Sequence, residues 1–102
     1  MDKGQAPKSA IEYARFIKRT TPGVQKIFLF GSYARGTHGK DSDIDLAIVF
    51  ERLGDAFDMQ VELMKKRRKF DTRIEPHPFA AGDFNLSHPL ACEIIRTGRE
   101  VL

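Results

Sequence analysis

The sequence lacks the features of a secreted or membrane protein. It has one cysteine, Cys92, so no internal disulfide can form, and we interpret this thiol as a buried structural group. No apolar run approaches the roughly 20 residues that a membrane helix needs. The first residues, Met1-Asp2-Lys3-Gly4, lack the apolar centre of a signal peptide. We therefore expect a cytoplasmic protein that does not enter a membrane.

The sequence also has little excess of charge of either sign, with a net charge of +3. Its basic residues cluster in the run KKRRK at residues 65–69. Such a run can bind nucleic acid or an acidic partner, but no aromatic residues interleave here to stack bases. The pattern favours the solvated C-terminal end of a helix, where cations complement the helix dipole. Direct binding to nucleic acid is not expected.

The apolar pattern and the breakers predict alternating helices and strands. Helices are expected over residues 9–19, within 31–37, over 55–69 and from 87 to 98, and strands over 24–30, 43–50, 70–77 and 100–102. This order predicts an α/β (α+β) fold in which helices flank a small mixed β-sheet. The chain has 102 residues and no repeat or linker, so we expect a loose tail over residues 1–8 and a single domain over 9–102.

Local signals set several of these boundaries. Ser9 and Glu12 fit a capping box at the start of the first helix, and Ser87 can cap the last. Pro76 and Pro78 are expected to end the third strand, because proline cannot donate to a β-ladder. The helix over residues 55–69 is expected to have one apolar face, formed by Phe57, Val61 and Met64.

The stretch IFLFGSYARGTHGKDSDIDLAIVF, residues 27–50, carries the candidate chemistry. Asp43 and Asp45 point the same way because side chains alternate along a strand. Paired carboxylates repel each other unless a cation lies between them, and magnesium is the first candidate, before calcium. The break at Gly31-Ser32 offers backbone N–H groups and a hydroxyl suited to phosphate. Together these features indicate phosphoryl or nucleotidyl transfer.

These residues resemble a known signature. Gly31-Ser32, a ten-residue gap and Asp43-Ile44-Asp45 are similar to the signature of polymerase-β-like nucleotidyltransferases. The surrounding GSYARGTHGKDSDIDL resembles the minimal nucleotidyltransferases, and the likeness covers most of the chain. The resemblance implies the polymerase-β-like nucleotidyltransferase fold. It also implies a third carboxylate on a neighbouring strand. Glu75 is the best match, although Pro76 replaces an apolar residue and Glu is longer than the commoner Asp. Asp71 is the alternative candidate for the third carboxylate. It can also be interpreted as a solvated residue at the start of the strand.

The resemblance also implies roles for the site residues. Asp43, Asp45 and Glu75 would be catalytic and would bind two Mg²⁺ ions, which in such sites lie ~4 Å apart. The nucleotide-binding group would be Gly31, Ser32, Arg35 and Ser42, with ATP as the substrate. In it, Ser32 would hold the terminal phosphates and Arg35 would neutralise pyrophosphate, unless Arg35 makes a surface salt bridge. Ser42 is expected to fix the loop before Asp43 by local hydrogen bonds.

The three histidines receive separate interpretations. His77 is expected to line the pocket, His38 to be an exposed loop residue, and His88 to be structural or exposed. Their spacing predicts no zinc site.

The resemblance implies a partner as well. Minimal nucleotidyltransferases are commonly antitoxins of HEPN-domain ribonuclease toxins, which implies AMP transfer from ATP to a toxin tyrosine. A second hypothesis is a non-catalytic binding module that neutralises its partner by docking. A third is one subunit of a two-chain enzyme that modifies a small molecule such as an aminoglycoside. An open sheet edge also allows a homo-oligomer.

Overall fold

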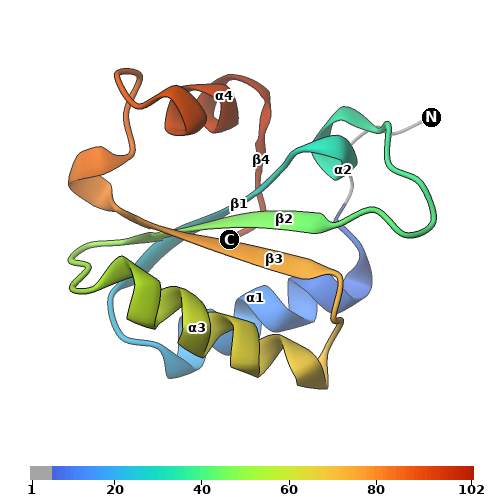
Figure 1. Cartoon of the computed structure of the whole chain (residues 1–102), viewed down its shortest axis with the longest axis horizontal. Helices are drawn as coiled ribbons and strands as arrows, with labels where there is room; N and C mark the ends of the chain where they lie inside the picture. Colours follow the sequence, from blue (N-terminus) through green and yellow to red (C-terminus); the bar gives the residue numbers. More distant parts are fainter. Residues whose placement is uncertain (1–5) are drawn as a thin grey trace.

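The computed structural model describes residues 6–102 and shows a mixed four-stranded β-sheet with helices on both faces (Figure 1). The strands are β1 (Val24–Phe30), β2 (Ile44–Phe50), β3 (Ile74–Ala80) and β4 (Arg99–Glu100). The helices are α1 (Lys8–Thr20), α2 (Ser32–Arg35), α3 (Ala56–Lys66) and α4 (Pro89–Thr97), with 3-10 turns η1 (Arg67–Lys69) and η2 (Ala81–Asp83). The predicted α/β (α+β) fold class is confirmed. None of the helices in this part of the chain has the length and apolar character needed to cross a membrane.

The sheet has the strand order β3-β2-β1-β4. The predicted central position of β1 is confirmed, since β1 pairs with β2 and with β4, both antiparallel. β3 pairs with β2 in parallel and forms one edge of the sheet, while β4 forms the other. β4 spans residues 99–100 rather than the expected 100–102.

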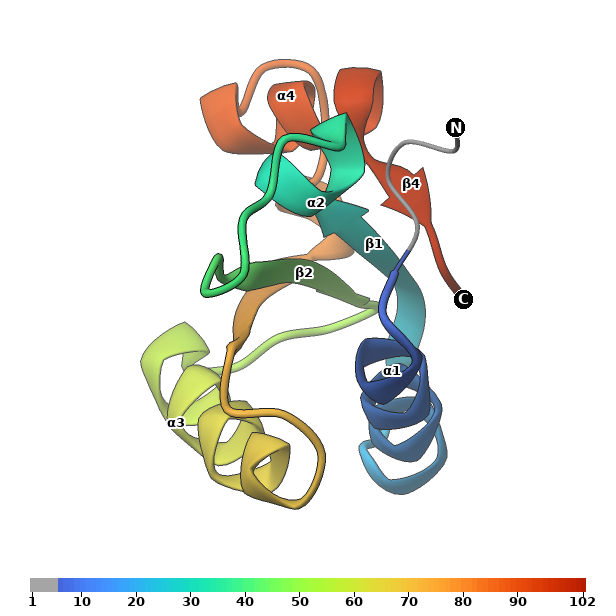
Figure 2. The ribbon, with the colours of Figure 1, turned by 90° about the vertical axis from the view of Figure 1, so that its right-hand side faces the viewer.

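The two faces of the sheet carry different layers (Figure 2). Even-numbered residues of β2, such as Ile44 and Leu46, pack with residues of α1 and α3 in the larger hydrophobic cluster. Odd-numbered residues such as Ala47 and Val49 pack with α4 in a smaller cluster. Asp45 belongs to this odd set, so its side chain faces the α4 side of the sheet.

The start of α1 differs from the prediction. Of the expected tail over residues 1–8, residues 1–5 lie outside the described part of the chain, and Lys8 already belongs to α1. Pro7 occupies the N-cap position and provides no side-chain cap, so the predicted capping box at Ser9 is wrong. The Ser9 hydroxyl donates instead to Asp71 Oδ2, at 2.8 Å. Ser9 thus makes a hydrogen bond to a residue distant in the sequence instead of the predicted capping bond within the first turn of the helix.

The prediction that two prolines end the third strand is also wrong. Pro76 and Pro78 lie inside β3, which begins four residues later and ends three residues later than expected. Ile44 N–H donates to the carbonyl of Arg73, just before β3. The odd-numbered residues of β3 therefore direct their backbone N–H and C=O groups at β2, and the even-numbered residues direct theirs at the free edge. The Pro76 carbonyl accordingly accepts from Gln60 of α3, at 3.0 Å. Proline is tolerated because its nitrogen faces the free edge of the sheet.

The face of α3 that packs on the sheet is not the predicted one. Leu63 is the fully buried residue of α3, and Met59, one turn earlier, packs beside it in the core. Phe57 and Val61, which belong to the predicted apolar face, are 74% and 37% exposed. The buried carbonyl of Leu63 accepts a hydrogen bond from Tyr13 of α1, which fixes how α3 sits against α1. An apolar stripe of α3 therefore remains at the surface.

The last helix has the expected end but a different cap. His88 Nδ1 accepts a hydrogen bond from Ala91 N–H at 3.2 Å, so His88 rather than Ser87 caps α4. Ala91 and Ile94 are buried under the sheet. Cys92 is a free thiol at intermediate burial, less enclosed than predicted.

Candidate active site

The turn after β1 lies directly against one of the paired carboxylates. Phe30, the last residue of β1, is in register with Asp45 of β2. Gly31 follows with φ 75° and ψ −151°, a conformation that residues with a Cβ rarely adopt. A Cβ at this position would collide with Asp45 Oδ2. Gly31 is therefore needed both for the turn and for the close approach of the turn to Asp45.

Asp43 and Asp45 lie where β2 begins. Asp43 is exposed just before the strand, and the Asp45 side chain is 26% exposed. Asp45 Oδ1 lies 3.3 Å from His77 Nε2 on β3. The His77 ring also packs edge-on against Phe30, at 5.1 Å between ring centroids. His77 thus lines the site as predicted, but its contact with Asp45 depends on the β2–β3 register and has no signal in the local sequence.

Glu75 lies on β3 directly in register with Asp45, so the two side chains share one face of the sheet. The Glu75 carboxylate, however, is paired with Arg67, whose Nη1 lies 3.4 Å from Glu75 Oε2. The same Nη1 donates to the carbonyl of Ile74, at 2.7 Å. Within residues 6–102, no three His, Cys, Asp or Glu side chains are grouped closely enough to hold a metal ion.

Asp71, the alternative third carboxylate, lies in the turn before β3 rather than on the strand. Arg73 donates to it through Nε, at 3.0 Å to Oδ1, and through Nη2, at 2.8 Å to Oδ2. Ser9 donates to the same Oδ2. The Arg73 hydrogen bonds hold the pKa of the Asp71 carboxyl well below its usual range. These contacts favour Glu75 over Asp71 as the third carboxylate.

Arg73 also anchors the loop that leads to Asp43. Its Nη1 donates to the Tyr33 hydroxyl, at 3.0 Å, and to the carbonyl of Lys40, at 3.3 Å. The Tyr33 ring stacks on His38, with ring centroids 3.9 Å apart and planes 8° from parallel. The loop is therefore held between α2 and the start of β3. His38 is exposed, as predicted.

Removing the Asp71 charge is expected to destabilise the fold without touching the site carboxylates. At pH 7, Asp71→Asn should lower the free energy of unfolding by about 2 kcal/mol, because it weakens charge-assisted hydrogen bonds. A carboxyl whose folded pKa is lowered stabilises the fold above its unfolded pKa, near 4, and this contribution is lost as the pH falls further. The difference between variant and wild type should therefore shrink below about pH 4.

Urea unfolding at a series of pH values measures this difference. The matched control is Asp83→Asn, which removes an exposed carboxylate that makes no ion pair within the described part of the chain. A loss of stability that is equal for both variants, or that does not change with pH, would contradict the assigned role of Asp71.

Ser32 and Arg35 lie on the short helix α2, beside the turn at Gly31. The Ser32 hydroxyl makes no hydrogen bond to any described residue, which leaves it available to a ligand. Arg35 Nη1 lies 3.9 Å from Glu93 Oε2, and both side chains are about half exposed. This contact is a surface salt bridge, the role predicted as the alternative to binding pyrophosphate.

Ser42 acts on the loop as predicted. Its Oγ accepts a hydrogen bond from the backbone N–H of Gly39, at 2.7 Å, and its own N–H donates to the Gly39 carbonyl, at 3.3 Å. This local pair closes the turn immediately before Asp43.

The family of the chain follows from its match to a family model. The model of the nucleotidyltransferase domain matches residues 10–99, which is nearly the whole chain. The chain belongs to the nucleotidyltransferase domain family. The matched range contains β1, the turn at Gly31, Asp43, Asp45 and β3.

This nucleotidyltransferase domain also has named relatives. It is 43% identical over 61 residues to the "Putative protein adenylyltransferase MJ0604" of Methanocaldococcus jannaschii, covering 58% of this chain and 57% of the relative. It is 32% identical over 66 residues to the protein adenylyltransferase MntA of Shewanella oneidensis, covering 52% of this chain and 48% of the relative. The chain spans about half the length of the curated relatives it matches.

The fold of the nucleotidyltransferase domain has a close counterpart among solved structures. A toxin–antitoxin complex with AMP-PNP contains a chain that superposes with a TM-score of 0.70 at 22% identity. The superposition covers 94% of this chain and 73% of that chain. At this identity, the likeness establishes the fold.

The magnesium implied by this family fits part of the site. Asp43 and Asp45 offer hard carboxylate oxygens that remain open to solvent, which is the donor type that magnesium prefers. Glu75 shares the face of the sheet that carries Asp45, but its carboxylate has to leave Arg67 before it can join a metal site there.

Proposed function

We propose that this domain transfers AMP from ATP to a hydroxyl of a partner protein in the cytoplasm, with a tyrosine of a HEPN-domain toxin as the acceptor. The observation that carries the proposal is the close approach of the Gly31 turn to Asp45. In the proposed reaction the backbone of this turn binds phosphate and the carboxylate binds metal. The relatives named protein adenylyltransferases support a protein acceptor. The toxin–antitoxin complex with AMP-PNP supports a nucleotide and a toxin partner.

The residues of the chain take complementary parts in this reaction. The acceptor oxygen forms a bond to the α-phosphorus of ATP. The bond between the α-phosphorus and the oxygen that bridges it to the β-phosphorus breaks, and pyrophosphate leaves with that oxygen. The Gly31 backbone and the Ser32 hydroxyl hold the phosphates. Arg35 exchanges Glu93 for the departing pyrophosphate, because pyrophosphate carries more negative charge than one exposed carboxylate.

Asp43 and Asp45 would hold two magnesium ions, and Glu75 would complete the ligand set of the second ion. Bound magnesium would supply charge neutralisation at the attacking and leaving oxygens. Glu75 lies on the face of Asp45 and, once free of Arg67, accepts the proton of the acceptor hydroxyl. Ser42 keeps the loop in the position from which Asp43 enters the site.

The test is intact mass spectrometry of the protein encoded by the neighbouring gene, after incubation with this chain, ATP and magnesium. We expect mass increments of AMP on that protein and none when EDTA removes the metal, with recovery on adding magnesium back. If the proteins co-purify without any increment, the proposal fails. Turnover of a diffusible acceptor, without a label on protein, would instead indicate a small-molecule nucleotidyltransferase.

The second candidate is a binding module that neutralises its partner by docking alone. It is favoured by the pairing of Glu75 with Arg67, which keeps the third carboxylate engaged outside the metal site. Under this alternative, a variant without Asp43 and Asp45 carboxylates neutralises the partner in cells as well as the wild type does.

A further inference from the structure

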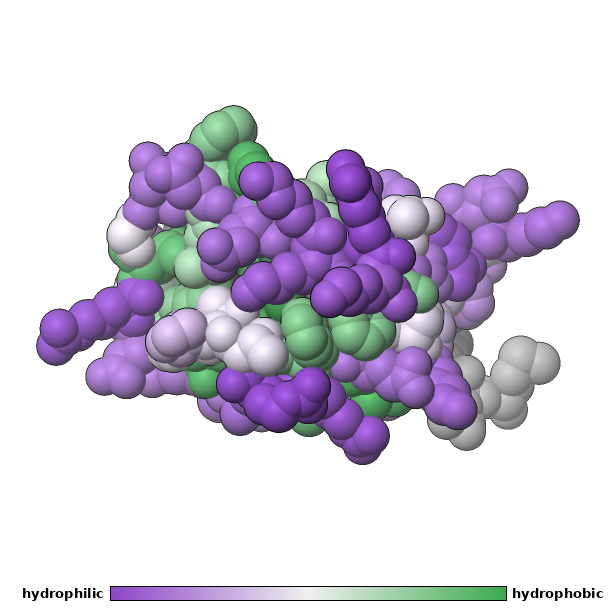
Figure 3. Space-filling view, turned by 90° about the horizontal axis from the view of Figure 1, so that it is seen from below, coloured by the Kyte–Doolittle hydropathy of each residue, from purple (hydrophilic) through white to green (hydrophobic). Residues whose placement is uncertain are grey.

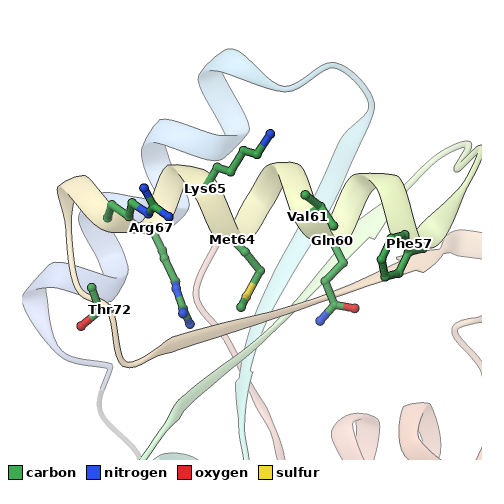
Figure 4. A pocket seen from close by; sticks show the side chains of 8 residues that line it. Phe57, Gln60, Val61, Met64, Lys65, Arg67 and Thr72 are labelled. Atoms are coloured by element: carbon green, nitrogen blue, oxygen red, sulfur yellow. The ribbon is translucent and has the colours of Figure 1, made fainter.

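A groove runs along α3 and η1 and ends at Thr72, in the turn before β3 (Figure 4). It has a volume of about 500 Å³. Its apolar half is formed by Phe57, Val61 and Met64, the stripe of α3 that does not pack in the core. Figure 3 shows the face that carries α1 and α3, where hydrophobic side chains lie between hydrophilic ones. Exposed apolar side chains gathered in one hollow are typical of a protein-binding site.

The other half of the groove is basic. Lys65, Arg67 and Arg68 line it, and no carboxylate does. Lys65 and Arg68 are exposed and form no ion pair with any residue of the described chain. The groove therefore complements an acidic surface that has apolar side chains beside it.

The groove is connected to the candidate active site. Arg67 lines it and also contacts Glu75. At its other end, Phe57 and Gln60 are shared with a second hollow of about 400 Å³ that reaches His77, the histidine beside Asp45. A protein seated in the groove therefore lies beside Arg67, the partner of Glu75, and beside the hollow that reaches His77.

The structure limits how that protein can bind. A partner strand cannot add regularly to β3, because Pro76 and Pro78 present no N–H at the free edge. The Pro76 carbonyl already accepts from Gln60, and the Ile74 carbonyl from Arg67. Docking must therefore rely on side chains. Single-stranded nucleic acid is disfavoured, because Phe57 is the only aromatic residue lining the groove.

We propose that this groove, along α3 and η1, is the docking surface for the acceptor protein, which enters it with an acidic side chain at the Arg68 end and apolar side chains against Phe57. The proposal rests on the proposed function, because it takes the occupant to be the protein that receives AMP. It assigns the recognition of the acceptor to residues outside the catalytic group.

The experiment measures the affinity of the purified acceptor protein, from the neighbouring gene, by isothermal titration calorimetry. The Asp43→Asn/Asp45→Asn background prevents chemistry during binding. Phe57→Ala and Arg68→Glu should each weaken binding about tenfold or more, as expected for central interface residues. The matched controls, Leu86→Ala on an exposed apolar residue outside the groove and Arg99→Glu on β4 at the opposite edge, should bind like the background.

Binding that is unchanged in both groove variants overturns the docking surface, while AMP labelling by the wild type would still support the proposed function. Weakened binding without any AMP label supports the groove and contradicts the proposed function. A single-stranded RNA is the second probe. If RNA binds the background and Arg68→Glu removes that binding but leaves acceptor binding intact, the groove is a nucleic-acid site and the proposal is wrong.

Discussion

Replacing Asp43 and Asp45 together by asparagine is expected to lower the rate of AMP transfer by about a thousandfold or more. Metal ions in such sites contribute several kcal/mol of transition-state stabilisation, and each 1.4 kcal/mol corresponds to about tenfold in rate. Asparagine has the same shape but lacks the negative charge that retains the metal. The rate is measured as label incorporated into the acceptor protein from ATP labelled in its α-phosphate.

The fold should survive this change, because Asp43 is exposed and Asp45 is partly so. Asparagine at position 45 can still hydrogen-bond His77. The matched control is Asp41→Asn, which removes an exposed charge from the same loop, two residues before Asp43. If the double variant modifies the acceptor at the wild-type rate, the carboxylate mechanism is wrong. If it loses transfer but still neutralises the partner in cells, docking alone explains the biological effect.

The parts of the site that lie within one strand or one turn could be predicted from the sequence. The bounds of β1 match the prediction, and β2 begins one residue later than expected. Both are apolar runs bounded by strong turn signals, so local pattern and tertiary structure agree. The shared direction of Asp43 and Asp45 stays a prediction, because Asp43 lies one residue before β2.

The parts that depend on pairing between distant segments could not be predicted. The contact of His77 with Asp45 requires the parallel register of β2 and β3, which no local pattern sets. The pairing of Glu75 with Arg67 requires the position of η1 at the edge of the sheet. Pro76 and Pro78 indicate the end of a strand when its place in the sheet is unknown. β3 is an edge strand, and there proline is tolerated.

Competition between local and distant partners explains the remaining differences. Ser9 has the right spacing for a cap, yet its hydroxyl binds Asp71, 62 residues away in the sequence. Phe57, Val61 and Met64 have helical spacing, but Met59 and Leu63 do as well, and the latter pair faces the core. Amphipathic spacing shows that a helix has an apolar face without showing which of two adjacent stripes the sheet covers.

Gly31→Ala is expected to lower both stability and activity. Alanine at the φ of Gly31 costs about 1–3 kcal/mol of backbone strain. Its Cβ would also collide with Asp45 Oδ2, so the carboxylate or the turn has to move. A displacement of about 1 Å at a reacting group can lower the rate about a hundredfold. Urea unfolding measures the first effect, and the rate of AMP transfer at saturating ATP and acceptor measures the second.

Gly23→Ala separates these two effects. Gly23 also has positive φ, at 86°, but a Cβ there would meet nothing within 4 Å. This control should lose stability through strain while keeping the wild-type rate, because nothing near the carboxylates moves. If Gly31→Ala is destabilised to a similar extent and yet transfers AMP at the wild-type rate, then Gly31 is only a turn residue. The contact between the turn and Asp45 would then have no part in the proposed transfer.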